Sequence, residues 1–181
     1  MTMWCPVMGV TTPNAKNPRS ELRETQNGAN YNWLVTAGTA TLTATVMVSK
    51  IPSVGGKVVV GQIHGNGTTV YTFLEIAYQS GTVIAEVTTN PTTDAKAPAA
   101  TLATGIGLGT KFEYQIVTTK APDLTIAING QTMYHQPVDP SWVTPTMYFK
   151  AGSYPQANQA GTGATDGSQV SFYALSASHG P

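Results

Sequence analysis

One segment decides the fold class: Thr39-Ala40-Thr41-Leu42-Thr43-Ala44-Thr45-Val46-Met47-Val48, in which threonines alternate with small or apolar residues before an apolar end. Successive side chains of a β-strand point to opposite faces, so this period of two predicts a strand. Further strands are expected in segments rich in β-branched residues, which are Val58 to His64, Val70 to Tyr78, Thr82 to Thr88, Phe112 to Thr118, Leu124 to Ile128, Thr146 to Gly152 and Val170 to Ala177. Turn-forming pairs such as Ser80-Gly81 and Asn129-Gly130 separate them and favour antiparallel hairpins.

Helix is expected to be minor. No stretch combines a sustained 3.6-residue apolar period with capping residues, and only Pro140 to Val143 suits a short helical turn. Thr92 to Thr104 and Ala157 to Ser168 are rich in small and turn-forming residues, so we expect two long loops there. The length of 181 residues fits one domain. The sequence therefore predicts an all-β protein, a two-sheet antiparallel β-sandwich of jelly-roll type.

Composition limits the partners. Hydrophobic residues make up 41% of the chain and charged residues 10%, which excludes a disordered tail and a highly charged nucleic-acid binder. No apolar run approaches the length needed to cross a membrane. The formal net charge is zero, so binding of an acidic partner depends on where charges are placed. The two arginines, Arg19 and Arg23, lie within one short stretch. Cys5 is the single cysteine, so no internal disulfide can form.

Three polar segments carry the candidate chemistry, and strand alternation sorts their side chains into rows that each share one face. The rows are Arg19, Glu21 and Arg23, then Gln62 and His64, then Tyr148, Lys150 and Tyr154. We expect the apolar residues between them, Leu22, Ile63 and Phe149, to point inward as anchors. Each row also has an ordinary interpretation, such as a solvated ion pair or a structural histidine. Arginine, amide, imidazole and phenol together, however, suit removal of a proton next to a carboxylate.

These three segments resemble the signature regions of polysaccharide lyase family 7, the alginate lyases with a β-jelly-roll fold. The longest match is Tyr148-Phe149-Lys150-Ala151-Gly152 followed by Tyr154 and Gln156, and the segments occur in the family's order along nearly the whole chain. Further likeness lies in Trp4-Cys5-Pro6-Val7 and in Val170-Ser171-Phe172-Tyr173-Ala174-Leu175. The resemblance implies a single catalytic domain over residues 1–181 with an open substrate groove. It also implies that the family's usual N-terminal strand is missing. The opening Met-Thr-Met-Trp-Cys-Pro lacks a basic start followed by a long apolar stretch, so we expect no signal peptide in this chain.

The resemblance further implies an alginate lyase that cleaves 1,4-glycosidic bonds by β-elimination, endolytically. Ile63 within Gln-Ile-His implies some preference for guluronate-containing stretches. The implied catalytic residues are Arg19, Gln62, His64 and Tyr154, and the implied substrate-binding residues are Glu21, Arg23, Tyr148, Lys150 and Gln156. We expect Glu21 to hold Arg19 or Arg23 by an ion pair. The resemblance requires no metal or cofactor, and it implies a secreted or periplasmic monomer whose partner is an acidic polysaccharide.

Three rival functions stay open at this stage. A jelly-roll glycoside hydrolase needs two carboxylates, for which Glu75 with Glu86, or Glu75 with Glu113, could be proposed. A non-catalytic uronate-binding jelly-roll module could keep the cationic residues for binding alone. A lyase that acts on glucuronan or another uronate polymer would share the same chemistry. His135 and His179 are scattered along the sequence, and we expect both to be structural or solvent-exposed.

Overall fold

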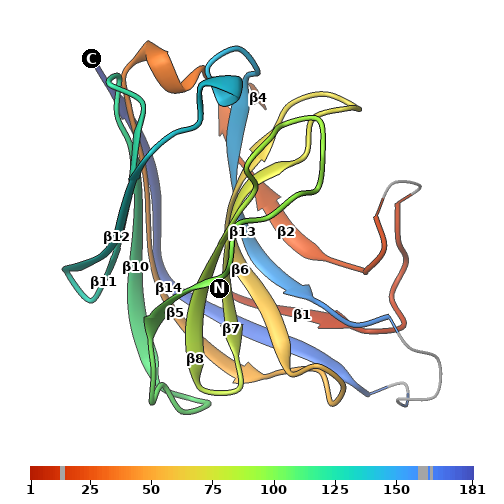
Figure 1. Ribbon diagram of the computed structural model, residues 1–181. Helices are drawn as coiled ribbons and strands as arrows, with labels where there is room; N and C mark the ends of the chain where they lie inside the picture. Colours follow the sequence, from red (N-terminus) through yellow and green to blue (C-terminus); the bar gives the residue numbers. More distant parts are fainter. Residues whose placement is uncertain (13–14, 159–162, 164) are drawn as a thin grey trace.

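The computed structural model describes residues 1–12, 15–158, 163 and 165–181 (Figure 1). Among the described residues, two six-stranded antiparallel sheets pack face to face, and the predicted jelly-roll sandwich is confirmed. The first sheet contains, in spatial order, β1 (Thr2–Pro6), β14 (Gly167–Gly180), β5 (Thr39–Lys50), β10 (Lys111–Thr118), β11 (Asp123–Ile128) and β12 (Gln131–Pro137). The second contains β2 (Ser20–Arg23), β13 (Met147–Pro155), β6 (Lys57–Gly65), β7 (Thr72–Gln79), β8 (Thr82–Val87) and β9 (Ala100–Ala103).

Small elements complete the chain. β3 (Thr25–Gln26) and β4 (Ala29–Asn30) form a hairpin, and two 3-10 turns lie at η1 (Val35–Ala37) and η2 (Pro140–Trp142). The helical turn expected near Pro140 is therefore confirmed as η2, where Asp139 caps the turn by accepting hydrogen bonds from the backbone and hydroxyl of Ser141.

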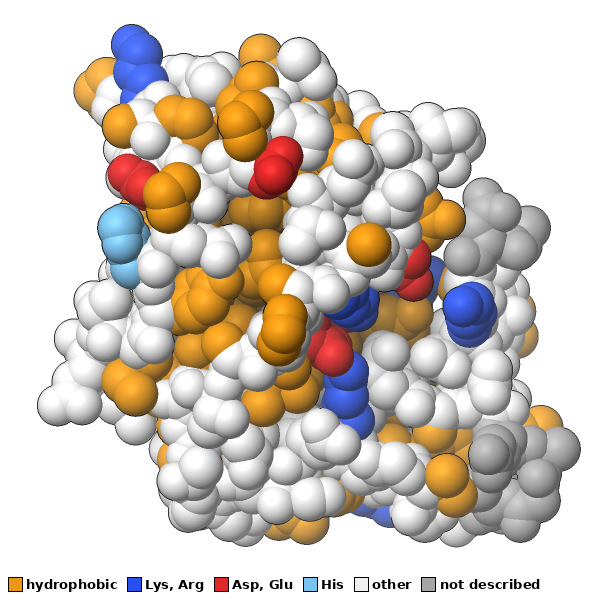
Figure 2. Space-filling model, in the orientation of Figure 1, with side chains coloured by type: hydrophobic (Ala, Val, Ile, Leu, Met, Phe, Trp, Pro, Cys, Tyr) orange, Lys and Arg blue, Asp and Glu red, His pale blue; other side chains and the backbone are white. Residues whose placement is uncertain are grey.

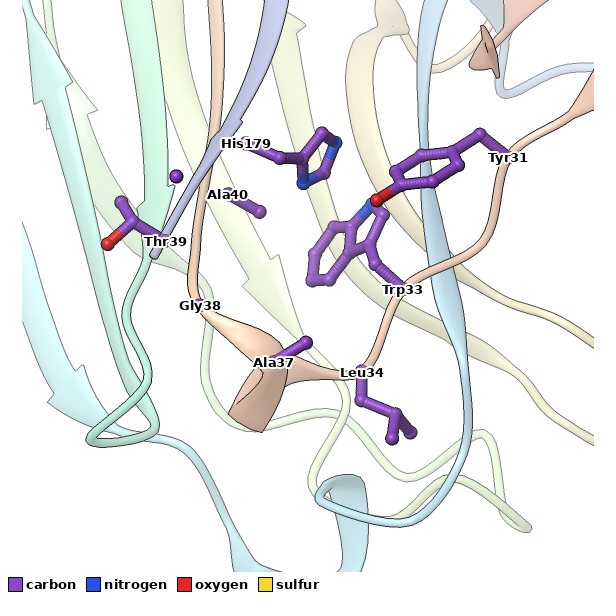
Figure 3. A pocket seen from close by; sticks show the side chains of 9 residues that line it. Tyr31, Trp33, Leu34, Ala37, Gly38, Thr39, Ala40 and His179 are labelled. Carbon is purple, nitrogen blue, oxygen red and sulfur yellow. The ribbon is translucent and has the colours of Figure 1, made fainter.

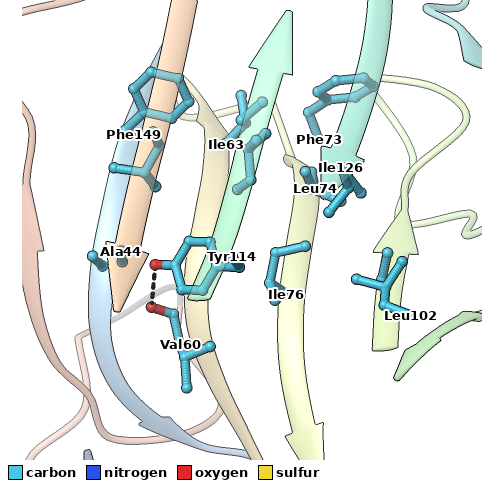
Figure 4. Packing of buried hydrophobic residues seen from close by; sticks show 14 of the residues in the cluster. Ala44, Val60, Ile63, Phe73, Leu74, Ile76, Leu102, Tyr114, Ile126 and Phe149 are labelled. Atoms are coloured by element: carbon cyan, nitrogen blue, oxygen red, sulfur yellow. Dashed lines mark hydrogen bonds between the residues drawn. The ribbon is translucent and has the colours of Figure 1, made fainter. Parts of the chain in front are cut away.

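The core lies between the two sheets, and the alternation in β5 explains how it forms. From Ala40 to Val48, the small and apolar side chains of β5 are buried, while the intervening threonines and Met47 are only half-buried on the other face. Figure 4 shows how Tyr114 of β10 reaches across to the second sheet, where its hydroxyl donates to the carbonyl oxygen of Val60 at 3.0 Å. A Cβ at position 61 would lie 2.5 Å from that hydroxyl, so Gly61 permits this close approach.

Three strands of the two large sheets, and the short hairpin of β3 and β4, were missed from the sequence. β9 lies inside the expected loop Thr92 to Thr104, so that prediction was wrong over Ala100–Ala103. β1 is short, and β12 is exposed along most of its length, so neither shows the apolar alternation that identified the others. The second expected loop falls partly outside the described residues, and its end was also wrong because β14 begins at Gly167.

A buried carboxylate fastens the end of β14 to the second sheet. His179 Nε2 lies 2.5 Å from Glu24 Oε1, and Glu24 Oε2 accepts hydrogen bonds from Trp33 Nε1 at 3.0 Å and from the backbone N–H of Phe149 at 2.9 Å. Figure 3 shows His179 beside Trp33 and Tyr31 at a small pocket, and the His179 and Tyr31 rings meet edge to face. These contacts give His179 the structural position that was expected.

Candidate active site

The outer face of the second sheet carries a polar row that crosses five strands. Strand register pairs Arg23 with Lys150, Lys150 with Gln62, Gln62 with Glu75, and Glu75 with Glu86. Directly paired residues share a face, so these side chains form one line across β2, β13, β6, β7 and β8. At about 4.8 Å per strand, the row is roughly 19 Å long.

An apolar row runs beside it. Val59, Ala77 and Ile84 form a small cluster of their own, separate from the main core, and the Tyr154 ring packs against them. Regular alternation would place Val59 on the same face as Ile63. The β6 register shifts between Val59 and Gly61, and this bulge turns Val59 toward Tyr154 instead.

Glu21 is the centre of the polar contacts. Its Oε1 accepts a hydrogen bond from Gln62 Nε2, and its Oε2 pairs with Lys150 Nζ. Arg19 Nη1 lies 3.8 Å from the same Oε2. The Glu21 side chain is 3% exposed, so these donors compensate for the removal of its charge from water. Because a carboxylate can only accept, Glu21 also fixes which end of the Gln62 amide faces it. The expected ion pair with Arg19 is present, but Lys150 and Gln62 contact Glu21 more closely.

His64 is held as a neutral base. Its ring stacks on Tyr148, with centroids 5.3 Å apart, and its Nδ1 lies 2.7 Å from the carbonyl oxygen of Gly65. A carbonyl accepts, so Nδ1 must carry the proton and Nε2 keeps a free lone pair in the neutral ring. Burial lowers the pKa of His64 to about 4, and the charges of Lys150, Arg19 and Arg23 act in the same direction. At neutral pH, His64 can therefore accept a proton at Nε2.

Tyr154 is placed to donate a proton. The Arg19 guanidinium lies over its ring, 4.8 Å from the centroid. Burial raises the pKa of Tyr154 while the charge of Arg19 opposes that change, so the phenol remains protonated at neutral pH. Gln156 follows on the same strand end, with Nε2 at 3.4 Å from the carbonyl oxygen of Tyr154.

Arg23 is oriented by groups that the sequence did not indicate. Its guanidinium lies 3.5 Å from the centroid of the Tyr148 ring, and Nη2 donates to Asn32 Oδ1 at 2.5 Å and to Asn66 Oδ1 at 3.5 Å. Asn66 and Asn32 both lie outside the three polar segments, so neither was among the predicted site residues. Among the inward anchors, Ile63 and Phe149 are buried, but Leu22 is 43% exposed, so that part of the prediction was wrong. Leu22 lies at the open edge of the sandwich, where it lines a crevice with Leu175 and Ala177.

The structure brings most predicted site residues into two contact groups, which adjoin where Arg23 pairs with Lys150 in the strand register. Glu21 joins Arg19, Gln62 and Lys150, Arg19 joins Tyr154, and Tyr148 joins Arg23 to His64. Within the described part of the chain, no group of three or more His, Cys, Asp or Glu residues is arranged to hold a metal ion. No helix of the described residues is long and apolar enough to cross a membrane.

The alternative carboxylate pairs are placed differently. Glu75 and Glu86 are neighbours on the polar row, and each is already paired with a lysine. Glu113 lies on β10 in the other sheet, so it cannot act across a bond from Glu75 on this face. Neither pair therefore offers two carboxylates facing each other across an open space, as a hydrolase needs.

The fold and this polar network define the class of protein, a polysaccharide lyase built on a β-jelly roll. Comparison with known proteins gives the family. The sequence model of the family described as alginate lyase matches residues 1–179, and the chain belongs to that family. No curated protein matches the chain.

Solved structures show the same likeness. Alginate lyase PA1167 from Pseudomonas aeruginosa superposes with a TM-score of 0.91 at 35% identity, and the match covers 99% of this chain and 82% of that one. Alginate lyase A1-II′, a member of polysaccharide lyase family 7, gives a TM-score of 0.86 at 33% identity, over 99% and 79% of the two chains. A variant of A1-II′ in complex with the substrate GGMG gives 0.87 at 32% identity, over 99% and 77%.

Proposed function

We propose that this protein cleaves the 1,4-glycosidic bonds of alginate by β-elimination. The observation that carries the proposal is that Arg19, Gln62, Lys150, His64 and Tyr154 lie on or next to neighbouring strands of one sheet face, with His64 Nδ1 bonded to the Gly65 carbonyl so that Nε2 stays free. The A1-II′ variants bound to the substrate GGMG and to the product GGG support alginate as the polymer.

The first chemical requirement is neutralisation of the substrate carboxylate. The C5 hydrogen of a uronate lies next to that carboxylate, and its removal creates a second negative charge that must be stabilised. Arg19 supplies positive charge, and Gln62 supplies a directed N–H because Glu21 holds its amide nitrogen in place. Lys150, Arg23, Tyr148 and Gln156 bind and orient the neighbouring sugar groups. These contacts strengthen as charge develops, so they favour the transition state over the bound substrate.

Proton transfer depends on the sugar. Guluronate and mannuronate differ in configuration at C5, so their C5 hydrogens lie on opposite faces of the ring. In guluronate, His64 takes the proton and Tyr154 donates one to the departing O4 from the other side. In mannuronate, Tyr154 could serve as both base and acid on one side. We propose a preference for guluronate-containing stretches, because Nε2 of His64 is ready to accept. Ile63 is fully buried beneath the site, so its influence on this preference is indirect.

The polar row favours internal cutting. It crosses five strands, or roughly 19 Å, so it can contact more than one sugar unit of a polymer, and we propose endolytic cleavage. We also propose that residues 1–181 act as one catalytic unit, as a monomer that meets its polymer outside the cytoplasm. Light scattering of the purified protein in solution would test the monomer.

One assay tests the proposed function. The intact protein is incubated in parallel with polymannuronate, polyguluronate and glucuronan, and the unsaturated product is followed by its ultraviolet absorbance. We expect product from alginate blocks, fastest from polyguluronate, with a broad range of oligomer sizes early in the reaction. Reducing ends without absorbance would indicate a hydrolase, and binding without either would indicate a non-catalytic module. If glucuronan were turned over fastest, the protein would be a glucuronan lyase and not an alginate lyase.

A matched pair of tyrosine variants tests the acid. Tyr154→Phe should abolish turnover while largely preserving binding, because it removes a proton donor and keeps the ring. Tyr173→Phe is the control, since Tyr173 is exposed on β14 in the other sheet. Full activity of Tyr154→Phe would exclude Tyr154 as the proton donor.

A further inference from the structure

The polar row continues beyond Gln62 into a charged cluster that the proposed mechanism does not use. Glu75 and Glu86 lie directly opposite each other on β7 and β8. Lys57 Nζ lies 2.5 Å from Glu86 Oε2, and Lys96 Nζ lies 2.6 Å from Glu75 Oε2 and 3.7 Å from Glu86 Oε2. In the view of Figure 2, acidic and basic side chains lie close together near the middle of an otherwise largely uncharged face.

Lys96 is the outermost member of this cluster. It lies outside the named strands, yet it pairs with Thr88 in an isolated antiparallel bridge, and its side chain reaches back over β8 to β7. The Lys96 side chain is 31% exposed, whereas those of Glu75 and Glu86 are 8% and 16% exposed. The ammonium group therefore covers the carboxylates on the solvent side. An ammonium group has three N–H donors, and among the described residues Lys96 Nζ has a hydrogen bond to Glu75 Oε2, while Glu86 Oε2 at 3.7 Å is beyond hydrogen-bond distance.

We propose that Lys96 forms a second carboxylate-binding site in the groove, for a uronate other than the one that is cleaved. This inference rests on the proposed function, because it takes the substrate to be a uronate polymer. The partners of Lys96, Glu75 and Glu86, lie one and two strand spacings from Gln62, roughly 5 and 10 Å, so a uronate farther along the polymer would meet Lys96. Lys96 would then hold the polymer farther along the groove from Arg19 and Gln62.

Charge counts along the row support this role. The cleavage half has three cations, Arg19, Arg23 and Lys150, against one carboxylate, Glu21. The distal half has two lysines against two carboxylates, so it is neutral as a unit. Loss of Lys96 would leave two carboxylates with one lysine, and the groove would then repel a polyanion there. Glu75, Glu86 and Asp94 together raise the pKa of Lys96 although burial opposes this, so the lysine stays charged.

The test compares Lys96→Met with the unaltered protein on guluronate oligomers of increasing length. KM and the calorimetric Kd for long oligomers should rise about tenfold, while kcat stays within about twofold, because the lost contact is remote from the reacting bond. The shortest cleavable oligomer should show no change. Lys111→Met is the matched control, because Lys111 lies over the Tyr173 ring on the other sheet, and it should leave every value unchanged.

Lys96→Met leaves Glu75 short of a partner and could unfold the protein, so Lys96→Met/Glu75→Gln is compared with Glu75→Gln alone. The double variant keeps the distal half neutral through Lys57 and Glu86. Equal Kd values for these two variants on long oligomers would overturn the proposal, since Lys96 would then only neutralise Glu75. If the protein binds polyguluronate in a Lys96-dependent manner but releases no product, lyase activity is refuted and the Lys96 binding site is supported. If turnover is normal and the Kd for long oligomers is the same with and without Lys96, only the proposed binding site is refuted.

Discussion

Glu21→Gln should separate the role of Glu21 from that of an ordinary surface ion pair. The substitution keeps the shape but leaves Lys150, whose side chain is 10% exposed, without its closest counter-charge. Removing one partner of a buried ion pair costs about 3–5 kcal/mol, and Arg19, whose side chain is 27% exposed, loses the same counter-charge. Gln62 also loses the acceptor that fixes its amide, so kcat should fall by about 100-fold.

The pH dependence of that loss gives a sharper test. Burial already lowers the pKa of Lys150 and Glu21 opposes this, so the variant should lower it further. Unfolded chains then bind more protons than folded ones between the lowered pKa and the ordinary 10.5, and stability rises with pH in that window. Urea unfolding should therefore show a large deficit at about pH 7 that shrinks toward about pH 10, with an unchanged m-value.

Two further variants complete that experiment. Glu21→Gln/Lys150→Met removes both charges and should recover most of the stability but not the activity. Glu113→Gln, on the first sheet, is the control and should change stability by less than about 0.5 kcal/mol. A deficit below about 1 kcal/mol in Glu21→Gln, equal at both pH values, would refute the reasoning.

Other predictions concern the histidine and the two arginines. His64→Asn should abolish cleavage of polyguluronate and should also flatten the rise of stability between pH 4 and pH 6.5, because unfolded His64 titrates at 6.5 and the folded residue at about 4. That rise is worth about 3 kcal/mol in the unaltered protein, and an unchanged slope in urea unfolding would contradict it. Arg19→Ala should mainly reduce kcat, by about 2–4 kcal/mol of transition-state stabilisation, since it contacts the charge that develops. Arg23→Ala should mainly raise KM and make KM less dependent on salt. If steady-state kinetics showed a loss of kcat for Arg23→Ala and only a raised KM for Arg19→Ala, Arg23 would be the residue that neutralises the carboxylate and Arg19 the one that binds the polymer.

The sequence was sufficient where local alternation determined side-chain direction. The threonine pattern of β5 indicated the sandwich, and the parity of β13 placed Tyr148 and Lys150 on the face that also carries Tyr154, although the β13–β6 register shifts between Ala151 and Tyr154. Val59 could not be placed in this way. The bulge in β6 reverses its direction, and the sequence sign of it was Gly61, because an isolated glycine inside a strand often marks a bulge.

Long-range pairing was the other limit. The sequence suggested that Glu21 holds an arginine of its own strand, but its closest partners come from β6 and β13, which lie far along the chain. Lys96 carried no signal because it stands in a segment without strand periodicity, and its partner Glu75 lies on another strand. Such contacts depend on which strands become neighbours, and local periodicity does not contain that information.

The cations near the cleavage site should have two opposing effects in the proposed reaction. They attract the uronate carboxylate, and, adding to the effect of burial, they lower the pKa of His64, the proposed base. Arg19 and Lys150 attract the uronate carboxylate, yet with burial they also keep the pKa of His64 near about 4, which makes it a weak base. A bound carboxylate places a negative charge among the same cations and offsets their effect on the imidazole. We therefore expect the pKa of His64 to rise when a uronate binds, so that the imidazole becomes a stronger base beside the proton that it is to take. Glu21 cannot produce this change by itself, because its carboxylate is already paired with Lys150 and Gln62 in the free protein.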